Sequence, residues 1–199
     1  MRFTGCLFCS WHENLSSCSF YLPTNKGKII AVERNAKRFK VLKTILAKNC
    51  KNQENNIQCL NSDFLTLNPE NFKNVEYMVV DPTCSGSGTD LKEKQKSEQK
   101  DEIARLAKLA NLQATILKHA FKFPGLKKLA YSTCSVNNEE NEKVVEEILN
   151  YVKGQFKLVK VMPKWERRGV LGYEKCLRVD PKVDLCTGFF VAVFEKIEN

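Results

Sequence analysis

VEYMVVDPTCSGSG, at residues 75–88, is the stretch that decides the fold class of this chain. Its first six residues are mostly apolar, and an Asp-Pro pair and a run rich in Gly and Ser follow them. A short apolar run that ends at Pro and turn residues is typical of a buried strand. The stretch therefore predicts a strand at residues 75–80, followed by a loop whose glycines let the backbone approach a ligand closely.

Similar elements flank this strand on both sides. Short apolar runs predict further strands at residues 28–32, 57–60, 128–131, 156–161 and 189–194. Apolar residues at helical spacing predict helices at residues 36–49, 101–120 and 138–151. Strands that alternate with helices predict an α/β fold with a mostly parallel, Rossmann-like sheet. The last two strands have no helix between them, so we expect one strand near the C-terminus to run antiparallel.

The composition limits the classes of protein to which the chain can belong. It has 199 residues, 43% of them hydrophobic, and no apolar run of the roughly 18 residues that cross a bilayer. A net charge of +9 favours a polyanionic partner such as RNA or DNA. The nine cysteines are scattered and odd in number, which indicates reduced thiols rather than a disulfide framework. Cys6 and Cys9 have metal-like spacing, but without a second pair we expect no metal site.

Carboxylates follow three of the predicted strands. Glu33 comes directly after the first strand, where it could accept hydrogen bonds from the ribose of a nucleoside cofactor or simply face water. Arg38, on the next helix, could contact the same cofactor or solvent. Asp63 follows the second strand and could bind an adenine amino group or cap the next turn. Asp81 ends the strand quoted above. Because ligands of such sheets bind at the carboxyl ends of the strands, this placement favours a functional site.

Two cysteines lie at strand ends in separate motifs. Cys84 closes the sequence Asp-Pro-Thr-Cys, and Cys134 lies in Thr-Cys-Ser after the strand at residues 128–131. Either could be a structural thiol, because cysteine is often buried in cores. Cys134 also precedes the helix predicted at residues 138–151, whose dipole would favour a thiolate.

The two cysteines and Asp81 together suit one chemistry. C5 of cytosine takes a methyl group only after a thiolate has added to C6 and made C5 electron-rich. One cysteine would supply that thiolate, and the other could assist its elimination. Asp81 could hydrogen-bond N3 and N4 of a base that has left its stack.

The two motifs resemble those of Sun-type RNA cytosine-5 methyltransferases, and most of all the eukaryotic branch that acts on large-subunit (28S) ribosomal RNA. The resemblance runs from about Gly27 to the C-terminus. It rests on VVDPTCSGSG at residues 79–88, YSTCS at 131–135, EENE at 139–142 and GFFVAV at 188–193. It implies a class I methyltransferase fold, S-adenosyl-L-methionine as methyl donor and ribosomal RNA as substrate. We also expect a monomer of the nucleus and nucleolus, without membrane association.

The resemblance also implies a role for each site residue. Cys134 would be the nucleophile and Cys84 would aid product release, whereas in DNA cytosine methyltransferases the cysteine of the Pro-Cys motif attacks. Asp81 would act on the base as well as on the cofactor side. The implied cofactor-binding residues are Glu33, Arg38, Asp63 and Asp81.

The first motif departs from the family pattern. The family has a loop like Cys-Ala-Ala-Pro-Gly-Asn-Lys-Thr, whereas residues 9–16 read CSWHENLS and Leu7 stands at an acidic position. Glu13 adds a side chain where backbone should approach the cofactor. We therefore expect a weak first strand in an atypical, N-terminally truncated segment at residues 1–25, before a methyltransferase domain at 26–199. The alternative to an active enzyme is a non-catalytic RNA-binding remnant without effective cofactor binding.

Overall fold

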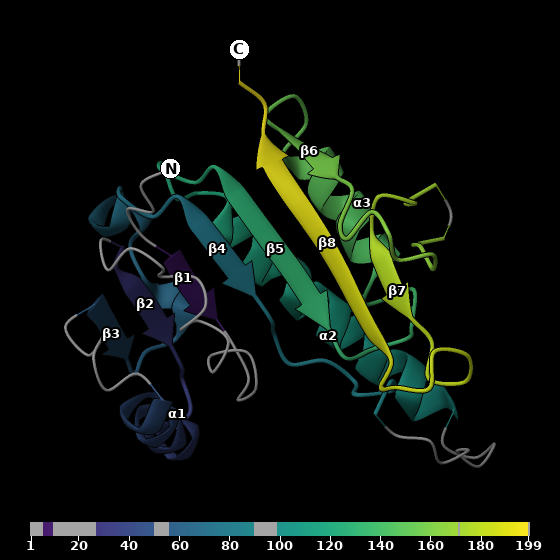
Figure 1. The fold of residues 1–199 in the computed structure, drawn as a ribbon, viewed down its shortest axis with the longest axis horizontal. Coiled ribbons are helices and arrows are strands. Elements are labelled where there is room, and N and C mark those ends of the chain that lie inside the picture. Colours follow the sequence, from purple (N-terminus) through teal and green to yellow (C-terminus); the bar gives the residue numbers. More distant parts are fainter. Residues whose placement is uncertain (1–5, 10–26, 50–55, 90–98, 171, 199) are drawn as a thin grey trace. The chain divides into compact units, whose positions relative to one another are not determined.

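The computed structural model describes residues 6–9, 27–49, 56–89, 99–170 and 172–198. The chain divides into two compact units, whose elements are labelled in Figure 1. The first contains residues 1–81 and 119–129, and the second contains residues 82–118 and 130–199. The three strand-end carboxylates belong to the first unit, and both motif cysteines belong to the second.

A parallel sheet with strand order β3-β2-β1-β4 forms the first unit. Its strands are β1 (Cys6–Cys9), β2 (Ile29–Val32), β3 (Ile57–Leu60) and β4 (Tyr77–Val80). β1 lies between β2 and β4, so that Cys9 is opposite Val32 on one side and Val80 on the other. Glu33 and Asp81 therefore leave the sheet at the same level, at the carboxyl edge where such sheets bind ligands.

Helix α1 (Ala36–Asn49) packs on β2 through an apolar face. Asn35 caps it, because its side-chain oxygen accepts hydrogen bonds from the backbone N–H groups of Lys37 and Arg38. The helix and the strand share a buried cluster of Ile29, Ala31, Leu42 and Leu46. Two 3-10 helices, η3 (Phe64–Thr66) and η4 (Pro69–Phe72), follow β3.

Strands in the order β5-β8-β6 belong to the second unit, and β7 also pairs with β8. Its elements are most of α2 (Gln99–Ala120), most of β5 (Lys128–Thr133), α3 (Glu142–Tyr151), β6 (Phe156–Val159), β7 (Leu177–Val179) and β8 (Phe189–Lys196). β8 runs antiparallel to β6 and β7. Alternate residues of β8 are fully buried, namely Phe190, Ala192 and Phe194. One face of β8 therefore lies in the core, as the two-residue period of a strand requires.

The predicted fold class is confirmed: the strands of the first unit pair in parallel, and β8, near the C-terminus, runs antiparallel to its neighbours β6 and β7 in the second unit. Several bounds shift by about two residues, and two larger differences from the expectation occur. α3 begins at Glu142 instead of residue 138, and β7 had no sequence signal. The expected weak first strand is β1, with four residues at the centre of its sheet. The loop at residues 10–16 lies outside the described residues, and the boundary at residue 25 stays a prediction.

Candidate active site

Cys84 and Cys134 lie side by side in the second unit. Cys84 belongs to the loop after β4, and Cys134 is the first residue after β5. Their sulfur atoms are 3.0 Å apart, although 50 residues separate them in the chain. The two cysteine motifs singled out in the sequence thus meet at their reactive atoms.

The contact between the two sulfurs raises the pKa of the Cys84 thiol above its usual range. The hydrogen bond to Cys134 is the largest cause, and burial of Cys84 acts in the same direction. A backbone hydrogen bond from Gly86 lowers this pKa but does not reverse the shift. The Cys84 thiol is therefore harder to deprotonate than an ordinary cysteine, and either sulfur can donate in the contact with Cys134.

A helix N-terminus does not activate Cys134, so this part of the sequence expectation is wrong. Helix α3 begins at Glu142, eight residues after Cys134. Asn141 has φ −109° and ψ −96°, which is not a helical conformation. The dipole of a helix acts mainly within its first turn, so it is too remote to favour a thiolate here.

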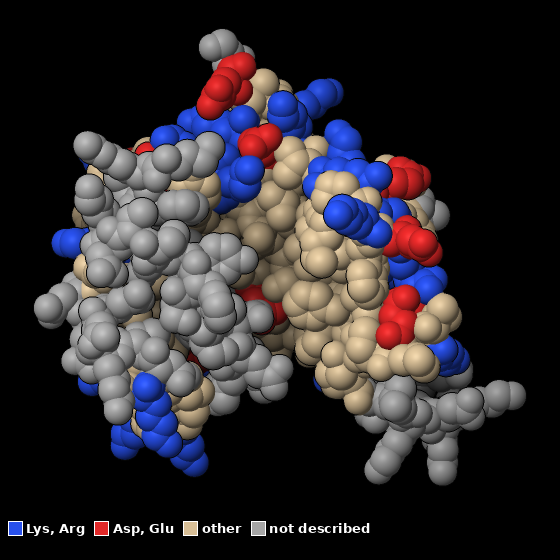
Figure 2. Space-filling view, in the orientation of Figure 1, with Lys and Arg blue, Asp and Glu red and all other residues tan. Residues whose placement is uncertain are grey.

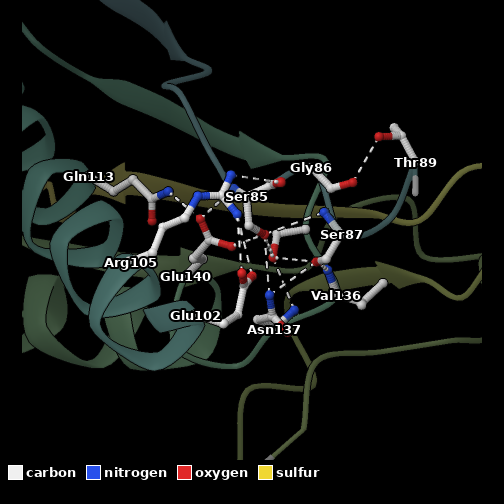
Figure 3. A network of polar contacts seen from close by, with 11 residues as sticks. Ser85, Gly86, Ser87, Thr89, Glu102, Arg105, Gln113, Val136, Asn137 and Glu140 are labelled. Atoms are coloured by element: carbon white, nitrogen blue, oxygen red, sulfur yellow. Dashed lines mark hydrogen bonds and ion pairs between the residues drawn. The ribbon is translucent and has the colours of Figure 1, made fainter. Parts of the chain in front are cut away.

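A buried carboxylate connects the two cysteine loops (Figure 3). Glu140 is 0% exposed, and both of its oxygens accept hydrogen bonds. Its Oε1 lies 2.8 Å from the backbone nitrogen of Ser85 and 3.0 Å from Nε2 of Gln113, and its Oε2 lies 2.5 Å from Ser85 Oγ. Gln113 also donates to the carbonyl oxygen of Thr83 at 3.1 Å. Glu140 and Gln113 therefore hold the residues on both sides of Cys84.

Hydroxyl and amide groups extend this network to the second cysteine loop. Ser85 Oγ lies 3.3 Å from Ser135 Oγ and accepts a hydrogen bond from Nδ2 of Asn137 at 3.2 Å. Ser87 Oγ accepts from the backbone N–H of Val136 at 3.0 Å and from the same amide of Asn137 at 3.1 Å. Side chains that lie about fifty residues apart in the chain thus hold the two loops together.

Backbone contacts reinforce the same arrangement. The N–H of Gly88 donates to the carbonyl oxygen of Cys134 at 3.0 Å, and the N–H of Gly188 donates to the carbonyl oxygen of Gly88 at 2.9 Å. A Cβ atom on Gly88 would lie 2.4 Å from the carbonyl oxygen of Gly188. Glycine is needed here because two backbones are in direct contact.

An ion pair with little exposure holds the segment after Cys134 to β7. Arg178 donates to both oxygens of Glu142 at 2.6 Å, and the two side chains are 15% and 1% exposed. Arg178 also donates to the carbonyl oxygen of Val136 at 2.9 Å and to Oδ1 of Asn138 at 2.5 Å. One guanidinium therefore fixes the path of the chain between Cys134 and α3.

Glu33 is buried at the end of β2 in the first unit, with 6% exposure. Its Oε1 accepts hydrogen bonds from the backbone N–H of Asn35 at 2.6 Å and from Nη2 of Arg38 at 3.1 Å. Within the described part of the chain, no hydrogen bond reaches its Oε2, which could accept one from a ligand hydroxyl. Arg38 is thus the partner that orients Glu33.

Asp63 and Asp81 are the other two strand-end carboxylates of the first unit. Oδ1 of Asp63 accepts from the backbone N–H of Leu65 at 3.0 Å, and Oδ2 lies 3.2 Å from Nη1 of Arg34. The structure therefore shows the capping role that the sequence left open for Asp63, at the start of η3. Asp81 is half-buried directly after β4, three residues before Cys84.

The described ranges hold neither a metal-binding cluster nor a membrane-spanning helix. No group of three or more His, Cys, Asp or Glu is placed there to hold a metal ion. None of the helices in that part of the chain is long and apolar enough to cross a membrane. The side chains of Cys6 and Cys9 lie outside the described part.

Sequence reasoning missed the polar residues that hold the cysteine loops. Gln113 is one of them, and its signal was a polar residue between Ala110 and Leu117 on the apolar face of α2. Glu140 and Glu142 belong to the EENE stretch, which supported the resemblance without a role for either side chain, and both are buried. Arg178 gave no signal.

The fold and the site define the class of protein. A mostly parallel sheet with one reversed strand, strand-end carboxylates and a pair of thiols is that of a Rossmann-like methyltransferase. A solved methyltransferase homologue from Pyrococcus horikoshii shares the fold with a TM-score of 0.75 at 22% identity, covering 98% of this chain and 62% of that protein. The structure of NSun6 from the same organism gives 0.72 at 20% identity, covering 98% of this chain and 48% of that protein.

The chain belongs to the 16S rRNA methyltransferase RsmB/F family, whose model matches residues 19–195. The 26S rRNA (cytosine-C(5))-methyltransferase of Caenorhabditis elegans is 44% identical over 88% of this chain. The 28S rRNA (cytosine-C(5))-methyltransferase of Mus musculus is 39% identical over 96% of it. These matches confirm the family resemblance inferred from the cysteine motifs. The chain spans 41% and 42% of the lengths of these two relatives.

Proposed function

We propose that this chain is the catalytic domain of an S-adenosyl-L-methionine-dependent RNA (cytosine-5) methyltransferase that modifies large-subunit ribosomal RNA. The observation that carries the proposal is the 3.0 Å contact between the sulfurs of Cys84 and Cys134. This chemistry needs one thiol that attacks the base, and it benefits from a second thiol beside the first. The relatives named as 26S and 28S rRNA (cytosine-C(5))-methyltransferases support the choice of base, carbon atom and RNA.

Cys134 is the nucleophile in this reaction. Its thiolate adds to C6 of a flipped-out cytosine, and the electrons of the C5–C6 double bond make C5 nucleophilic. Asp81 hydrogen-bonds N3 and N4 and stabilises the charge that the ring gains. S-adenosyl-L-methionine, when bound, supplies the electrophilic methyl group to which C5 forms its new bond.

Cys84 acts when the product leaves. A base removes the proton from C5, the C5–H electron pair re-forms the double bond, and the C6–S bond breaks with its electrons going to the sulfur of Cys134. That sulfur gains negative charge, and the Cys84 thiol lies 3.0 Å away with a proton to direct at it. The raised pKa of Cys84 suits this role because the thiol stays protonated at neutral pH.

Glu33 fits the adenosine part of the cofactor. It is buried at the end of β2, Arg38 holds its Oε1, and Oε2 faces no donor of the described residues. A carboxylate in this position can accept hydrogen bonds from ribose hydroxyls. Asp63 supports the same side through Arg34, which pairs with it at 3.2 Å. The cofactor-side residues in the proposal are Glu33, Arg38, Asp63 and Asp81.

Charge supports RNA as the partner. The net charge is +9, and Figure 2 shows Lys and Arg at the edge where β6 and α3 lie, with acidic side chains among them. Exposed lysines in this region are Lys153, Lys157, Lys160 and Lys164. Such a surface attracts phosphates without reading sequence, and the attraction weakens with salt. A nuclear and nucleolar location is part of the proposal because it fits a ribosomal RNA substrate, and we propose that the protein acts as a monomer.

Trapping of the covalent intermediate tests these assignments. We expect Cys84→Ala, with cofactor and a large-subunit ribosomal RNA fragment, to accumulate a protein–RNA adduct that survives denaturant. Cys134→Ala should form no adduct and transfer no methyl group. The reverse pattern would make Cys84 the nucleophile and overturn the assignment. Salt-sensitive RNA binding by the wild type, with neither adduct nor methyl transfer, would favour the non-catalytic RNA-binding remnant.

A further inference from the structure

We infer that Glu140 is a positioning residue for the release step, because it holds Cys84 where its thiol can reach the sulfur of Cys134. The inference rests on the proposed function and assigns a task to a side chain that neither cysteine motif contains. Among the described residues, the Glu140 carboxylate bonds to Ser85 and Gln113 and to neither sulfur. It therefore acts through Ser85, the residue that follows Cys84.

The environment of Glu140 fits a role in holding a loop. Its side chain is 0% exposed, and its backbone oxygen accepts a hydrogen bond from the hydroxyl of Tyr131 at 2.6 Å, which anchors it to β5. Its carboxylate reaches the other cysteine loop, 55 residues away in the chain, through both the backbone N–H and the hydroxyl of Ser85. Two bonds to one residue restrict rotation as well as distance. The direction of the Cys84 side chain is thereby restricted.

The carboxylate also sets the direction of the neighbouring hydrogen bonds. A carboxylate only accepts, so the single proton of the Ser85 hydroxyl points at Glu140 at 2.5 Å. The lone pairs of Ser85 Oγ then face the backbone N–H of Ser87 at 3.4 Å and Nδ2 of Asn137 at 3.2 Å. Figure 3 shows these groups converging on Ser85. One buried charge thus orders the contacts between the two cysteine loops.

Glu140→Gln tests this role with little change of shape. The glutamine oxygen can still accept from Ser85 N–H and from Gln113, but its amide must donate where Oε2 accepted, which reverses the bond to the Ser85 hydroxyl. Glu139→Gln is the matched control, because the Glu139 side chain is adjacent in sequence, is 45% exposed and pairs with Lys143. A cooperative thermal unfolding transition in each variant will show that both are folded.

The first readout is the covalent adduct with RNA and cofactor. We expect Glu140→Gln to release methylated RNA at least about tenfold more slowly, while a larger fraction of the enzyme than in the wild type remains bound to RNA through Cys134. A double variant with Cys134→Ala should show no adduct. A purely structural role would lower adduct and product together, and that result would overturn the inference.

The second readout needs neither RNA nor cofactor. Diamide takes two hydrogens from a pair of adjacent thiols, which join as a disulfide while the diazene becomes a hydrazine. Cys84 and Cys134 should crosslink rapidly in the wild type and in Glu139→Gln, and at least about tenfold more slowly in Glu140→Gln. Equal rates in all three proteins would overturn the inference.

The two readouts separate the inference from the proposed function. If Cys84→Ala itself accumulates no adduct, the role of Cys84 in release fails, whatever the diamide rates are. If Cys84→Ala accumulates adduct but Glu140→Gln does not, the proposed function stands and the role of Glu140 in positioning fails.

Discussion

The cysteine loops of the second unit and the strand-end carboxylates of the first are held in opposite ways. The carboxylate of Glu33 accepts hydrogen bonds from Asn35 and Arg38, which lie two and five positions along the chain. Ser85 and Glu140, which hold the thiol side, lie 55 positions apart, and the ion pair of Arg178 with Glu142 spans 36. The carboxylate of Glu33 is thus held by neighbours in the chain, although Asp63 on the same side pairs with Arg34 from 29 positions away. The thiol side depends mainly on tertiary contacts.

This difference follows from what each side must do. A carboxylate that binds ribose needs only to stand at a strand end with one oxygen uncovered, and a capping residue and one arginine can arrange that. A thiol that aids another thiol must keep its position to within a few tenths of an ångström, because reaction rates fall steeply when reacting groups are misplaced. Substitutions on the thiol side should therefore affect both folding and chemistry, and those on the carboxylate side mainly ligand affinity.

Cys134→Ala should produce the largest effect. Loss of the nucleophile should lower methyl transfer by at least about 10³-fold, since the remaining groups cannot activate C5. The free energy of unfolding should change by no more than about 1 kcal/mol, because the side chain is half-buried and small. Transfer of a radiolabelled methyl group to RNA and urea unfolding measure the two quantities. Retained transfer would show that the thiol side is not the chemical centre.

Glu142→Ala should be the most destabilising change on the thiol side. It leaves Arg178 largely buried and without its carboxylate, which costs about 3–5 kcal/mol. Glu139→Ala breaks an exposed pair with Lys143 and should cost no more than about 1 kcal/mol. Urea unfolding compares the two. Equal losses of unfolding free energy in the two variants would mean that the buried ion pair contributes no more to stability than the exposed one.

Gly88→Ala, compared with Gly154→Ala, separates the cost of a steric clash from the cost of a left-handed backbone conformation. Its Cβ would lie 2.4 Å from backbone oxygen of Gly188, so a shift of the loop should cost about 1–3 kcal/mol and slow methyl transfer as well. Gly154→Ala serves as the control, because Gly154 has φ +79° but open space around it, and should cost about 1–2 kcal/mol without loss of activity. Unfolding and transfer assays on both variants check this, and unimpaired transfer by Gly88→Ala would contradict it.

Glu33→Gln tests the carboxylate side. Removal of the charge should weaken binding of S-adenosyl-L-methionine about tenfold, as expected for one charged hydrogen bond, and leave the diamide crosslinking of the cysteines unchanged. Isothermal titration measures the affinity. Glu70→Gln, an exposed glutamate of the same unit, is the control and should bind the cofactor normally. Equal affinities of the two variants would remove Glu33 from the cofactor site.

Stability above neutral pH should report on a buried thiol of the second unit. Burial, with Glu142 nearby, raises the pKa of Cys176 to about 12. In the unfolded chain the pKa of this thiol is about 8.5. Above that pH the folded state binds more protons than the unfolded state, so the free energy of unfolding falls as the pH rises. Cys176 should contribute a loss of about 1.4 kcal/mol per pH unit between about pH 9 and 11. The stabilisation is fully present below about pH 8.5.

Cys176→Ala should remove this contribution to the fall of the unfolding free energy with pH. Urea unfolding at several pH values measures it. Cys186→Ala, which removes an exposed thiol, is the matched control. A Cys176→Ala variant with the slope of the wild type would show that the thiol ionises equally easily in both states.

The elements that sequence predicted well are those whose apolar pattern is continuous. β4 follows from the run at residues 75–80, and α1 follows from its apolar face and from Asn35. β7 was missed because it has three residues, one of them Arg178, and no apolar run. The start of α3 was placed four residues early, since residues 138–141 read as helical. Thr133 and Ser135 bond Asn141 there and hold it in another conformation.

The sequence by itself determined the fold class, the two cysteine motifs and the acidic residues that follow β2, β3 and β4. These features are local, because a strand, a turn and a cap are specified by neighbouring residues. Only the tertiary structure decided that the sulfurs of Cys84 and Cys134 lie 3.0 Å apart, that Glu140 is a buried acceptor, and that both oxygens of Asp63 already have partners. The physical reason is that burial and hydrogen-bond partners depend on chain segments about fifty residues away, whose approach leaves no pattern in either segment alone.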